Sequence, residues 1–255
     1  MAKGILGAQL YSVKDFCKTA VEIAETLKKI KAIGYTSIQV SGFGPVDYKE
    51  VAKVLADSGL IVAATHCGWG DFQTKLDEVI DKHKAWKCVH PAVGALPKEY
   101  KGQDGLKKFI DELTPIAEKL NAAGMDFSYH NHSGEFVKFD GKCYLEHLYE
   151  RTSPKILKAE IDTYWIQHGG GDPAAWIRKL GRRQPLLHLK DMVIAEKEQR
   201  FAPVGEGNLN WPAIMSAAAE VGVEYYLVEQ DMSYGADPFE CLATSYRNLV
   251  KMGLK

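Results

Sequence analysis

The 255-residue sequence lacks the marks of a membrane protein and of a nucleic acid-binding protein. Its longest apolar runs, such as Leu60 to Ala64, have the length of a strand, far below the roughly 18 consecutive apolar residues of a membrane span. Lysine and arginine total 32 against 33 aspartates and glutamates, so no basic excess is present to neutralise a phosphate backbone. We therefore expect neither a membrane nor a nucleic acid as a partner.

Paired cysteines and a leader segment are also missing. The five cysteines are widely spaced, odd in number and contain no Cys-x-x-Cys pair, which argues against a disulfide framework and against a thiolate zinc site. Residues 1–7 contain no apolar stretch of the secretory type. We expect reduced, buried cysteines and a cytoplasmic protein, although trimming a leader would leave the same sequence.

The sequence alternates between strand-like and helix-like segments. Short β-branched or aromatic runs at 5–11, 37–40, 60–66, 87–90, 125–132, 157–165, 185–190 and 225–231 predict eight strands. Apolar residues three and four apart predict helices at 17–33, 47–58, 106–123 and 211–221, each followed by a glycine shortly before the next strand. This order and length predict a single (β/α)8 TIM barrel domain over residues 1–255.

An open, doubly wound α/β sheet is the main alternative fold. Such a sheet usually binds a nucleotide through Gly-x-Gly-x-x-Gly after its first strand. Here the first strand runs into Gln9-Leu10-Tyr11-Ser12-Val13-Lys14-Asp15, which contains no glycine. The sequence therefore favours the barrel.

Polar residues at the strand ends predict where the site lies, because the carboxyl ends of the strands surround the active site of a TIM barrel. These residues are Gln9, Tyr11, Gln39, His66, His90, His130, Asn131, His132, Asp162, His188, Lys190, Asp191, Glu229 and Asp231. Burying several imidazoles and carboxylates together costs free energy unless they pair or bind a cation. Histidines and carboxylates without cysteine suit Mn²⁺, Co²⁺, Zn²⁺ or Fe²⁺ better than Mg²⁺. His83, His147 and His168 lie away from the strand ends, and we expect them at the surface.

Six motifs carry a resemblance to a known group of barrels. They are Ala8-Gln9-Leu10-Tyr11-Ser12-Val13, Tyr129-His130-Asn131-His132-x-x-Glu135-Phe136, Asp162-Thr163-Tyr164-Trp165, His188-Leu189-Lys190-Asp191, Pro203-Val204-Gly205-Glu206-Gly207 and Val228-Glu229-Gln230-Asp231. In these motifs, which span nearly the whole chain, the sequence resembles the xylose isomerase-like TIM barrel superfamily. That group includes sugar phosphate isomerases/epimerases and AP endonuclease family 2.

The resemblance implies a divalent metal with one ligand from each of the last four strands, in the order glutamate, aspartate, histidine, glutamate. Asp162, His188 and Glu229 match the last three positions, and His130 stands where the family has its first glutamate. We assign His130 as the fourth ligand. Glu135 lies five residues further on and is the alternative source of the missing carboxylate.

The resemblance further implies a metal-dependent sugar or sugar phosphate isomerase or epimerase, which removes a proton beside a carbonyl through an enediolate. Glu229 is the expected base, and His130, His132 or Glu135 would return the proton on the other face. Aromatic rings can stack on a sugar, and cations can bind its oxygens. On this basis the expected substrate-binding residues are Tyr11, His66, Trp69, His132, Trp165, Lys190 and Arg200.

Two other functions stay open. A chain with one effective base could be a lyase, either of the inosose dehydratase type or acting on a 3-keto-glycoside. The loss of the family glutamate also suits a sugar-binding barrel without catalysis. An endonuclease would need further zinc ligands and a basic surface, and the sequence shows neither pattern. The sugar or cyclitol, its phosphorylation and the formation of a homodimer are likewise open.

Overall fold

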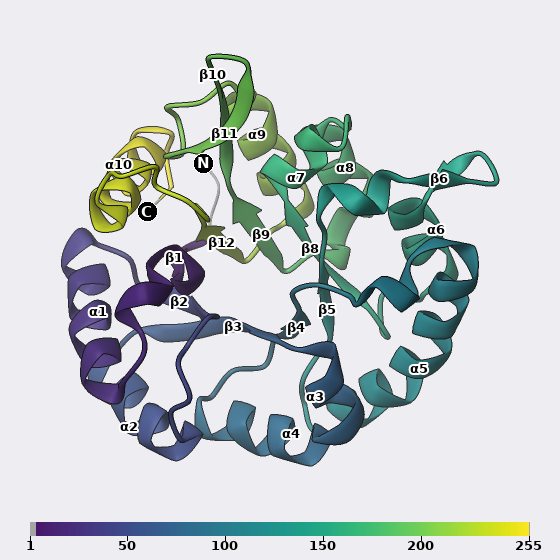
Figure 1. The fold of residues 1–255 in the computed structure, drawn as a ribbon, viewed down its shortest axis with the longest axis horizontal. Coiled ribbons are helices and arrows are strands. Elements are labelled where there is room, and N and C mark those ends of the chain that lie inside the picture. Colours follow the sequence, from purple (N-terminus) through teal and green to yellow (C-terminus); the bar gives the residue numbers. More distant parts are fainter. Residues whose placement is uncertain (1–3, 255) are drawn as a thin grey trace.

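Eight parallel strands close into a barrel in the computed structural model, which describes residues 4–254. The strands are β1 (Ile5–Gln9), β2 (Ser37–Val40), β3 (Ile61–Cys67), β4 (Pro91–Val93), β5 (Ser128–His130), β8 (Lys158–Asp162), β9 (Leu186–Leu189) and β12 (Tyr225–Val228). Strand β1 closes the ring by pairing with both β2 and β12. The predicted (β/α)8 barrel is confirmed (Figure 1).

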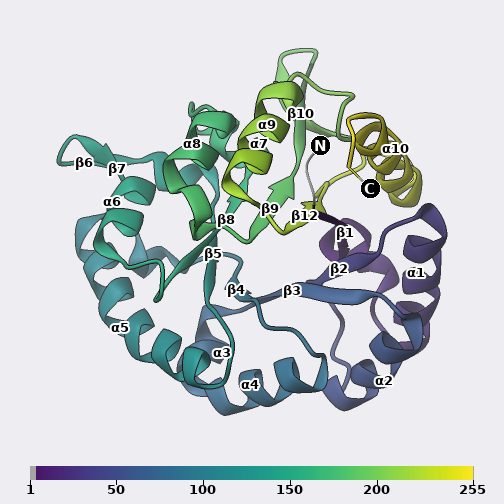
Figure 2. The same ribbon diagram turned by 180° about the vertical axis from the view of Figure 1, so that it is seen from behind.

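Helices form an outer ring around the barrel, as both views show (Figures 1 and 2). They are α1 (Ala20–Ile33), α2 (Tyr48–Ser58), α3 (Trp69–Thr74), α4 (Leu76–Ala85), α5 (Gly102–Ala122), α6 (Tyr144–Arg151), α7 (Thr163–His168), α8 (Pro173–Leu180), α9 (Trp211–Val221) and α10 (Pro238–Lys251). Short 3₁₀ helices are η1 (Leu10–Phe16), η2 (Lys98–Tyr100), η3 (Ser133–Phe136) and η4 (Gly181–Arg183). Most of the apolar core lies between this ring and the barrel wall, where Leu27, Phe109 and Ile214 are fully buried.

Capping residues set the helix boundaries. Asp172 accepts a hydrogen bond from Ala175 N (3.1 Å) at the start of α8, and a proline follows it in the first turn. Gly59 and Gly222 end α2 and α9 with φ angles of 66° and 79°, which glycine adopts without strain. Helix α9 has the predicted bounds.

The fourth strand lies later in the chain than the sequence predicts. Residues 87–90 are not a strand, and β4 begins at Pro91. Lys87 has a φ of 53°, and Cys88 N donates a hydrogen bond to the His83 carbonyl (2.9 Å). This segment therefore turns away from the end of α4 instead of extending along the barrel, and the predicted bounds are wrong.

The segment 191–209, which follows β9, contains the antiparallel hairpin β10 (Asp191–Ala195) and β11 (Glu198–Ala202). A second hairpin, β6 (Lys138–Phe139) and β7 (Lys142–Cys143), follows β5. The fully buried Asp191 carboxylate accepts hydrogen bonds from Gly205 N (2.8 Å), Gly207 N (3.0 Å) and Trp211 Nε1 (2.6 Å). These bonds hold the first hairpin at the carboxyl end of β9.

Two histidines expected at the surface are buried. His83 is fully inaccessible and His147 is 6% exposed. His83 Nδ1 donates to the Val79 carbonyl (2.6 Å), which leaves Nε2 to accept from the Thr65 hydroxyl (2.7 Å). The surface prediction is wrong for these two, since hydrogen-bond partners inside the protein replace water; His168 is exposed as predicted.

Two other expectations concern the cysteines and the membrane. All five cysteines are buried and unpaired, as predicted. Among residues 4–254, no helix combines the length and the apolar character that a membrane crossing requires.

Candidate active site

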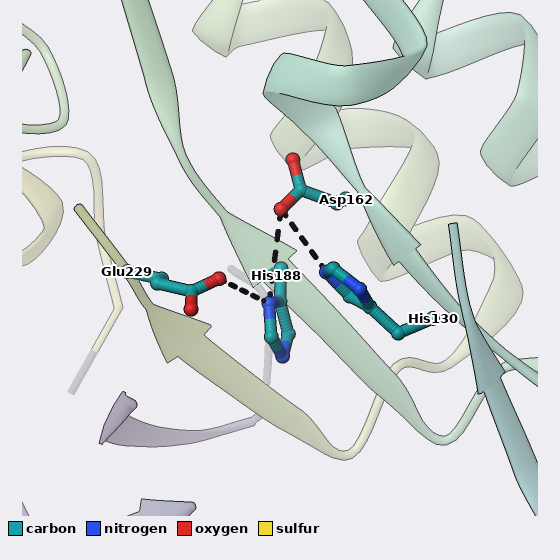
Figure 3. A group of neighbouring side chains, drawn as sticks. All are labelled: His130, Asp162, His188 and Glu229. Atoms are coloured by element: carbon teal, nitrogen blue, oxygen red, sulfur yellow. Dashed lines mark hydrogen bonds and ion pairs between the residues drawn. The ribbon is translucent and has the colours of Figure 1, made fainter. Parts of the chain in front are cut away.

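Four side chains from four strands meet at the carboxyl end of the barrel (Figure 3). His130 ends β5, Asp162 ends β8, His188 lies on β9 and Glu229 directly follows β12. All four are buried, and each offers a potential ligand atom within 4.8 Å of those of the other three. The structure thus brings together the four residues that the sequence assigns to a metal, here called the mouth cluster.

Direct contacts orient the mouth cluster. His188 Nδ1 lies 2.9 Å from Glu229 Oε2 and 3.8 Å from Asp162 Oδ2. His130 Nε2 lies 3.3 Å from the same aspartate oxygen. The other ring nitrogen of His130, Nδ1, is 3.1 Å from the Gly94 carbonyl, which can only accept a hydrogen bond. His130 therefore carries its proton on Nδ1 and turns Nε2 toward the centre of the cluster.

Lys190 places a buried positive charge beside the mouth cluster. Its Nζ lies 3.1 Å from Asp162 Oδ2, 2.8 Å from Glu229 Oε2 and 3.0 Å from Asp231 Oδ1. Burial disfavours the ammonium, but these three carboxylates outweigh it and hold the pKa of Lys190 well above its ordinary value. The Lys190 ammonium also lies over the ring of Trp165, with Nζ 5.6 Å from the indole centroid.

The charges of the cluster shift its pKa values in opposite directions. Burial alone would lower the pKa of His188, but the carboxylates of Glu160 and Glu229 raise it to about 10. Burial would raise the pKa of Glu229, but Lys190 and His188 hold it well below its ordinary value. Burial, followed by the charge of Glu229, raises the pKa of Asp231 to about 6. Glu229 is therefore ionised at neutral pH, the form that accepts a proton or binds a cation.

A second layer of polar residues lies behind the cluster. Glu160 is fully buried, and its oxygens contact Gln39 Nε2 (2.8 Å) and His66 Nε2 (2.7 Å). His188 Nε2 lies 2.6 Å from Gln39 Oε1 and 3.3 Å from Glu160 Oε1. The sequence analysis missed Glu160. A signal was available, because side chains two apart on a strand share a face and Asp162 already points into the barrel.

A cavity of about 390 Å³ opens over the mouth cluster, within the range typical of small-molecule sites. Its lining residues are Tyr11, Ser41, His66, Cys67, Gly68, Gly94, Ala95, His130, His132, Lys190, Glu229 and Asp231. Tyr11, His66, His132 and Lys190 are thus placed where the sequence analysis expects substrate-binding residues. Trp165 lies beside the cavity, with its ring 5.2 Å from that of His132.

Trp69 and Arg200 lie elsewhere. Trp69 is 2% exposed and packs on Phe109 and Phe127 in the core, with ring centroids 4.9 Å and 6.4 Å away. Arg200 lies on the β10–β11 hairpin and pairs with Glu198 (3.4 Å). The structure therefore brings neither to the cavity. The neighbouring Phe201, which the sequence analysis missed, has its ring centroid 5.5 Å from Lys190 Nζ.

Glu135 does not join the mouth cluster either. Its carboxylate accepts hydrogen bonds from the Tyr129 hydroxyl (2.7 Å) and from His132 N (3.0 Å). It lines a separate cavity of about 80 Å³, whose wall also contains Tyr100 and Tyr144. Tyr129 points away from the barrel interior because it alternates with His130 on β5, so Glu135 is drawn outward rather than back to the mouth.

The mouth cluster fits a divalent cation. Two imidazoles and two carboxylates form a mixed nitrogen and oxygen set, and their ligand atoms are close enough to converge on one ion. The two carboxylates are fully or almost fully buried, so a bound cation would offset the cost of burying their charge.

Comparisons with known proteins agree with this architecture. The sequence profile of the xylose isomerase-like TIM barrel family matches residues 27–240. A crystal structure of a sugar phosphate isomerase/epimerase from Parabacteroides distasonis superposes with a TM-score of 0.78 and 25% identity, covering 98% of this chain and 94% of that one.

Two curated relatives have other names. The rhizopine catabolism protein MocC of Rhizobium meliloti is 22% identical over 90% of this chain and 81% of its own length. An inosose dehydratase of Geobacillus thermodenitrificans is 23% identical over 86% of both chains. The names of these relatives are thus divided between isomerase/epimerase, dehydratase and a catabolic protein. Because the family profile covers most of its length, the chain belongs to the xylose isomerase-like TIM barrel family.

Proposed function

We propose that the chain is a metal-dependent sugar or sugar phosphate isomerase or epimerase that removes a proton beside a carbonyl. The observation that carries this proposal is the buried cluster of His130, Asp162, His188 and Glu229 under an open polar cavity. The names of the relatives support it, because isomerisation, epimerisation and dehydration of a hydroxyketone can all begin with loss of an α proton. Mn²⁺, Co²⁺, Zn²⁺ or Fe²⁺ in this cluster would polarise the substrate carbonyl and stabilise the negative charge of the enediolate.

Glu229 is the proposed base. It is ionised and lines the cavity, so its carboxylate can take the proton from the carbon next to the carbonyl. The electron pair of that C–H bond then becomes the enediolate double bond. An isomerisation is complete when Glu229 returns the proton to the former carbonyl carbon and the hydroxyl proton of the adjacent carbon moves to the former carbonyl oxygen. Delivery of a proton to the opposite face of the original carbon instead gives an epimer.

The other cavity residues are proposed to hold the sugar. The Lys190 ammonium can donate to a substrate oxygen, and the Tyr11 ring can pack on the apolar face of the sugar. Burial lowers the pKa of His132 to about 3, so this imidazole is neutral and offers one donor and one acceptor. Trp165, beside His132, extends the same wall.

A lyase is the second candidate function, favoured by the position of the carboxylates. A two-base epimerase of this family uses a glutamate on the fifth strand, where this chain has His130, and Glu135 is tied to Tyr129 and His132 N. Elimination needs only one base and one proton donor. Glu229 would remove the proton, and Lys190, whose Nζ is 2.8 Å away, would protonate the leaving oxygen.

The test is proton exchange in D₂O. Metal-free and Mn²⁺-loaded protein would be incubated with a panel of ketoses, 3-keto-glycosides and inososes, and the products followed by NMR. Metal-dependent exchange that yields a stereoisomer or an aldose–ketose pair is the result expected of the isomerase or epimerase. An unsaturated or cleaved product would instead establish the lyase. Metal binding without exchange in any compound would contradict both and favour a sugar-binding barrel.

A further inference from the structure

The group formed by His66, Glu160 and His188 resembles a second metal site, since their ligand atoms also lie within 4.8 Å of one another. Its hydrogen bonds indicate a different role. Both oxygens of Glu160 and both ring nitrogens of His66 already have partners inside the protein. A second cation would have to break these contacts, so the group serves the first site instead.

The direction of each hydrogen bond can be deduced from one end of the network. Tyr11 N can only donate, so Gln9 Oε1 is the acceptor (2.8 Å). The Gln9 amide nitrogen must then donate to His66 Nδ1 (3.4 Å). His66 consequently carries its proton on Nε2 and donates it to Glu160 Oε2 (2.7 Å). Glu160 is therefore required to be an acceptor.

The second branch leads from Glu160 to the mouth cluster. Because the Glu160 carboxylate only accepts, Gln39 Nε2 donates to its Oε1 (2.8 Å). The Gln39 amide is then oriented with its oxygen toward His188 Nε2 (2.6 Å), which must donate. His188 thus keeps a proton on Nε2, and Nδ1 is the nitrogen that faces Asp162 and Glu229.

We propose that Glu160 is a positioning residue that, through Gln39, keeps a proton on His188 Nε2 and so leaves Nδ1 as the nitrogen from which a metal at the mouth cluster would displace the proton. The inference rests on the proposed function in one respect, the metal at the mouth cluster. It adds a residue that neither touches the metal nor lines the substrate cavity. Histidine ligands commonly need such an outer partner, which fixes the ring and raises its basicity.

Glu160→Gln is the critical variant, because it keeps the size of the side chain and removes the obligate acceptor. A glutamine at 160 can donate to Gln39, which can then reverse and donate to His188 Nε2. That reversal moves the histidine proton to Nδ1 and blocks the metal. The expected result is Zn²⁺ binding about ten- to a hundredfold weaker than in the unchanged protein, measured by competition with a chromophoric chelator.

A charge swap separates this effect from general damage to the core. In the double variant Gln39→Glu with Glu160→Gln, a carboxylate again accepts from His188 Nε2, and the total charge is unchanged. It should recover most of the Zn²⁺ affinity lost in Glu160→Gln. Glu135→Gln removes a half-buried carboxylate outside both the network and the mouth cluster and should bind Zn²⁺ like the unchanged protein. A ¹H–¹⁵N spectrum of the Zn²⁺-loaded protein should show a protonated Nε2 and a coordinated Nδ1 for His188.

Three results would overturn the assignment: unaltered Zn²⁺ affinity in folded Glu160→Gln, no recovery in a folded swap variant, or coordination of His188 through Nε2. These readouts use Zn²⁺ alone, so they do not depend on the substrate. A protein that binds Zn²⁺ as described but exchanges no substrate proton would contradict the proposed function and leave the role of Glu160 intact. Metal-dependent proton exchange in the unchanged protein, together with unaltered Zn²⁺ affinity in Glu160→Gln, would support the proposed function and contradict the role of Glu160.

Discussion

At the scale of single residues, the site depends on charges that are buried in compensating pairs. Lys190 and His188 face the carboxylates of Asp162 and Glu229 within a few ångströms. Removing one member of such a set leaves its partner charged and unpaired, which costs about 3–5 kcal/mol in a buried site. Substitutions at these residues should therefore preserve the size of the side chain, and each variant should be tested for a retained fold before its activity or metal affinity is compared.

Glu229→Gln tests the proposed base. The amide cannot accept the α proton, so we expect metal-dependent exchange to fall by at least about a hundredfold, the usual contribution of a positioned general base. Circular dichroism and urea unfolding should show a retained fold. Full exchange activity in the folded variant would remove Glu229 from the mechanism.

His83 predicts a pH dependence that is independent of the site. Burial lowers the pKa of His83 to about 4 from an ordinary value of 6.5. Below pH 6.5 the unfolded chain therefore binds a proton at His83 that the folded protein excludes. The contribution of His83 to the free energy of unfolding is complete above pH 6.5 and is lost as the pH falls toward 4. A shift of this size corresponds to about 3 kcal/mol.

The measurement is urea unfolding at pH 7 and at pH 4.5 in the unchanged protein and in His83→Gln. The free energy of unfolding should fall less with acidification in the variant. An equal fall in both proteins would show that His83 does not contribute to acid sensitivity.

At the scale of elements, the β10–β11 hairpin is held by one carboxylate. Asp191→Asn keeps the size of the side chain but replaces one acceptor oxygen by an NH2 group. Oδ2 now accepts from Gly205 N, Gly207 N and Trp211 Nε1, and Oδ1 accepts from Met192 N and Leu209 N, so one of these two sets of donors loses its acceptor. We expect a loss of about 2–3 kcal/mol in the free energy of unfolding. Amide hydrogen exchange over 191–209 should accelerate relative to that of β12. Asp237→Asn, at an exposed helix cap, is the matched control and should lower the free energy of unfolding by less than Asp191→Asn does.

Sequence patterns predicted those elements whose signals are local. Helix α9 has the predicted bounds because an asparagine cap, an early proline and a final glycine define both ends. The fourth strand was misplaced because residues 87–90 have a strand-like composition but follow the turn that ends α4. The β10–β11 hairpin was missed because its anchor, Asp191, bonds to donors 14 to 20 residues away.

The site shows the same division between local and distant signals. His130, Asp162, His188 and Glu229 could be predicted as neighbours because each lies at or near the carboxyl end of a strand whose position in the barrel is set by chain order. The alternation along β8 could place Glu160 inside the barrel but could not predict its role, because that role depends on a hydrogen bond from Gln39, which is 121 positions away in the chain. Trp69 was misassigned because position near a strand end does not say which way a side chain turns.

At the scale of the whole molecule, metal binding should stabilise the barrel. The four cluster residues lie on, or directly after, four different strands, so the site exists only in the folded chain. A cation at about one hundred times its dissociation constant then adds about 2.7 kcal/mol. For a chain of this size that corresponds to a rise in Tm of roughly 5–10 °C.

Differential scanning calorimetry of chelator-treated protein, with and without added Zn²⁺ or Mn²⁺, measures this rise. His188→Gln, which lacks one nitrogen ligand, should show a smaller rise. An identical Tm with and without cation in the unchanged protein would argue against a site formed by the folded barrel.

The closure of β1 on β12 also has a consequence for synthesis on the ribosome. Gln9 and Tyr11 emerge first, yet the last residue of the mouth cluster, Glu229, follows the strand that must insert between β9 and β1 to complete the ring. A nascent chain that stops before β12 has three of the four residues of the mouth cluster and an open gap between the edges of β9 and β1. If the cluster binds a cation as proposed, binding would be a late event in biogenesis and would mark a chain in which β1 and β12 have paired.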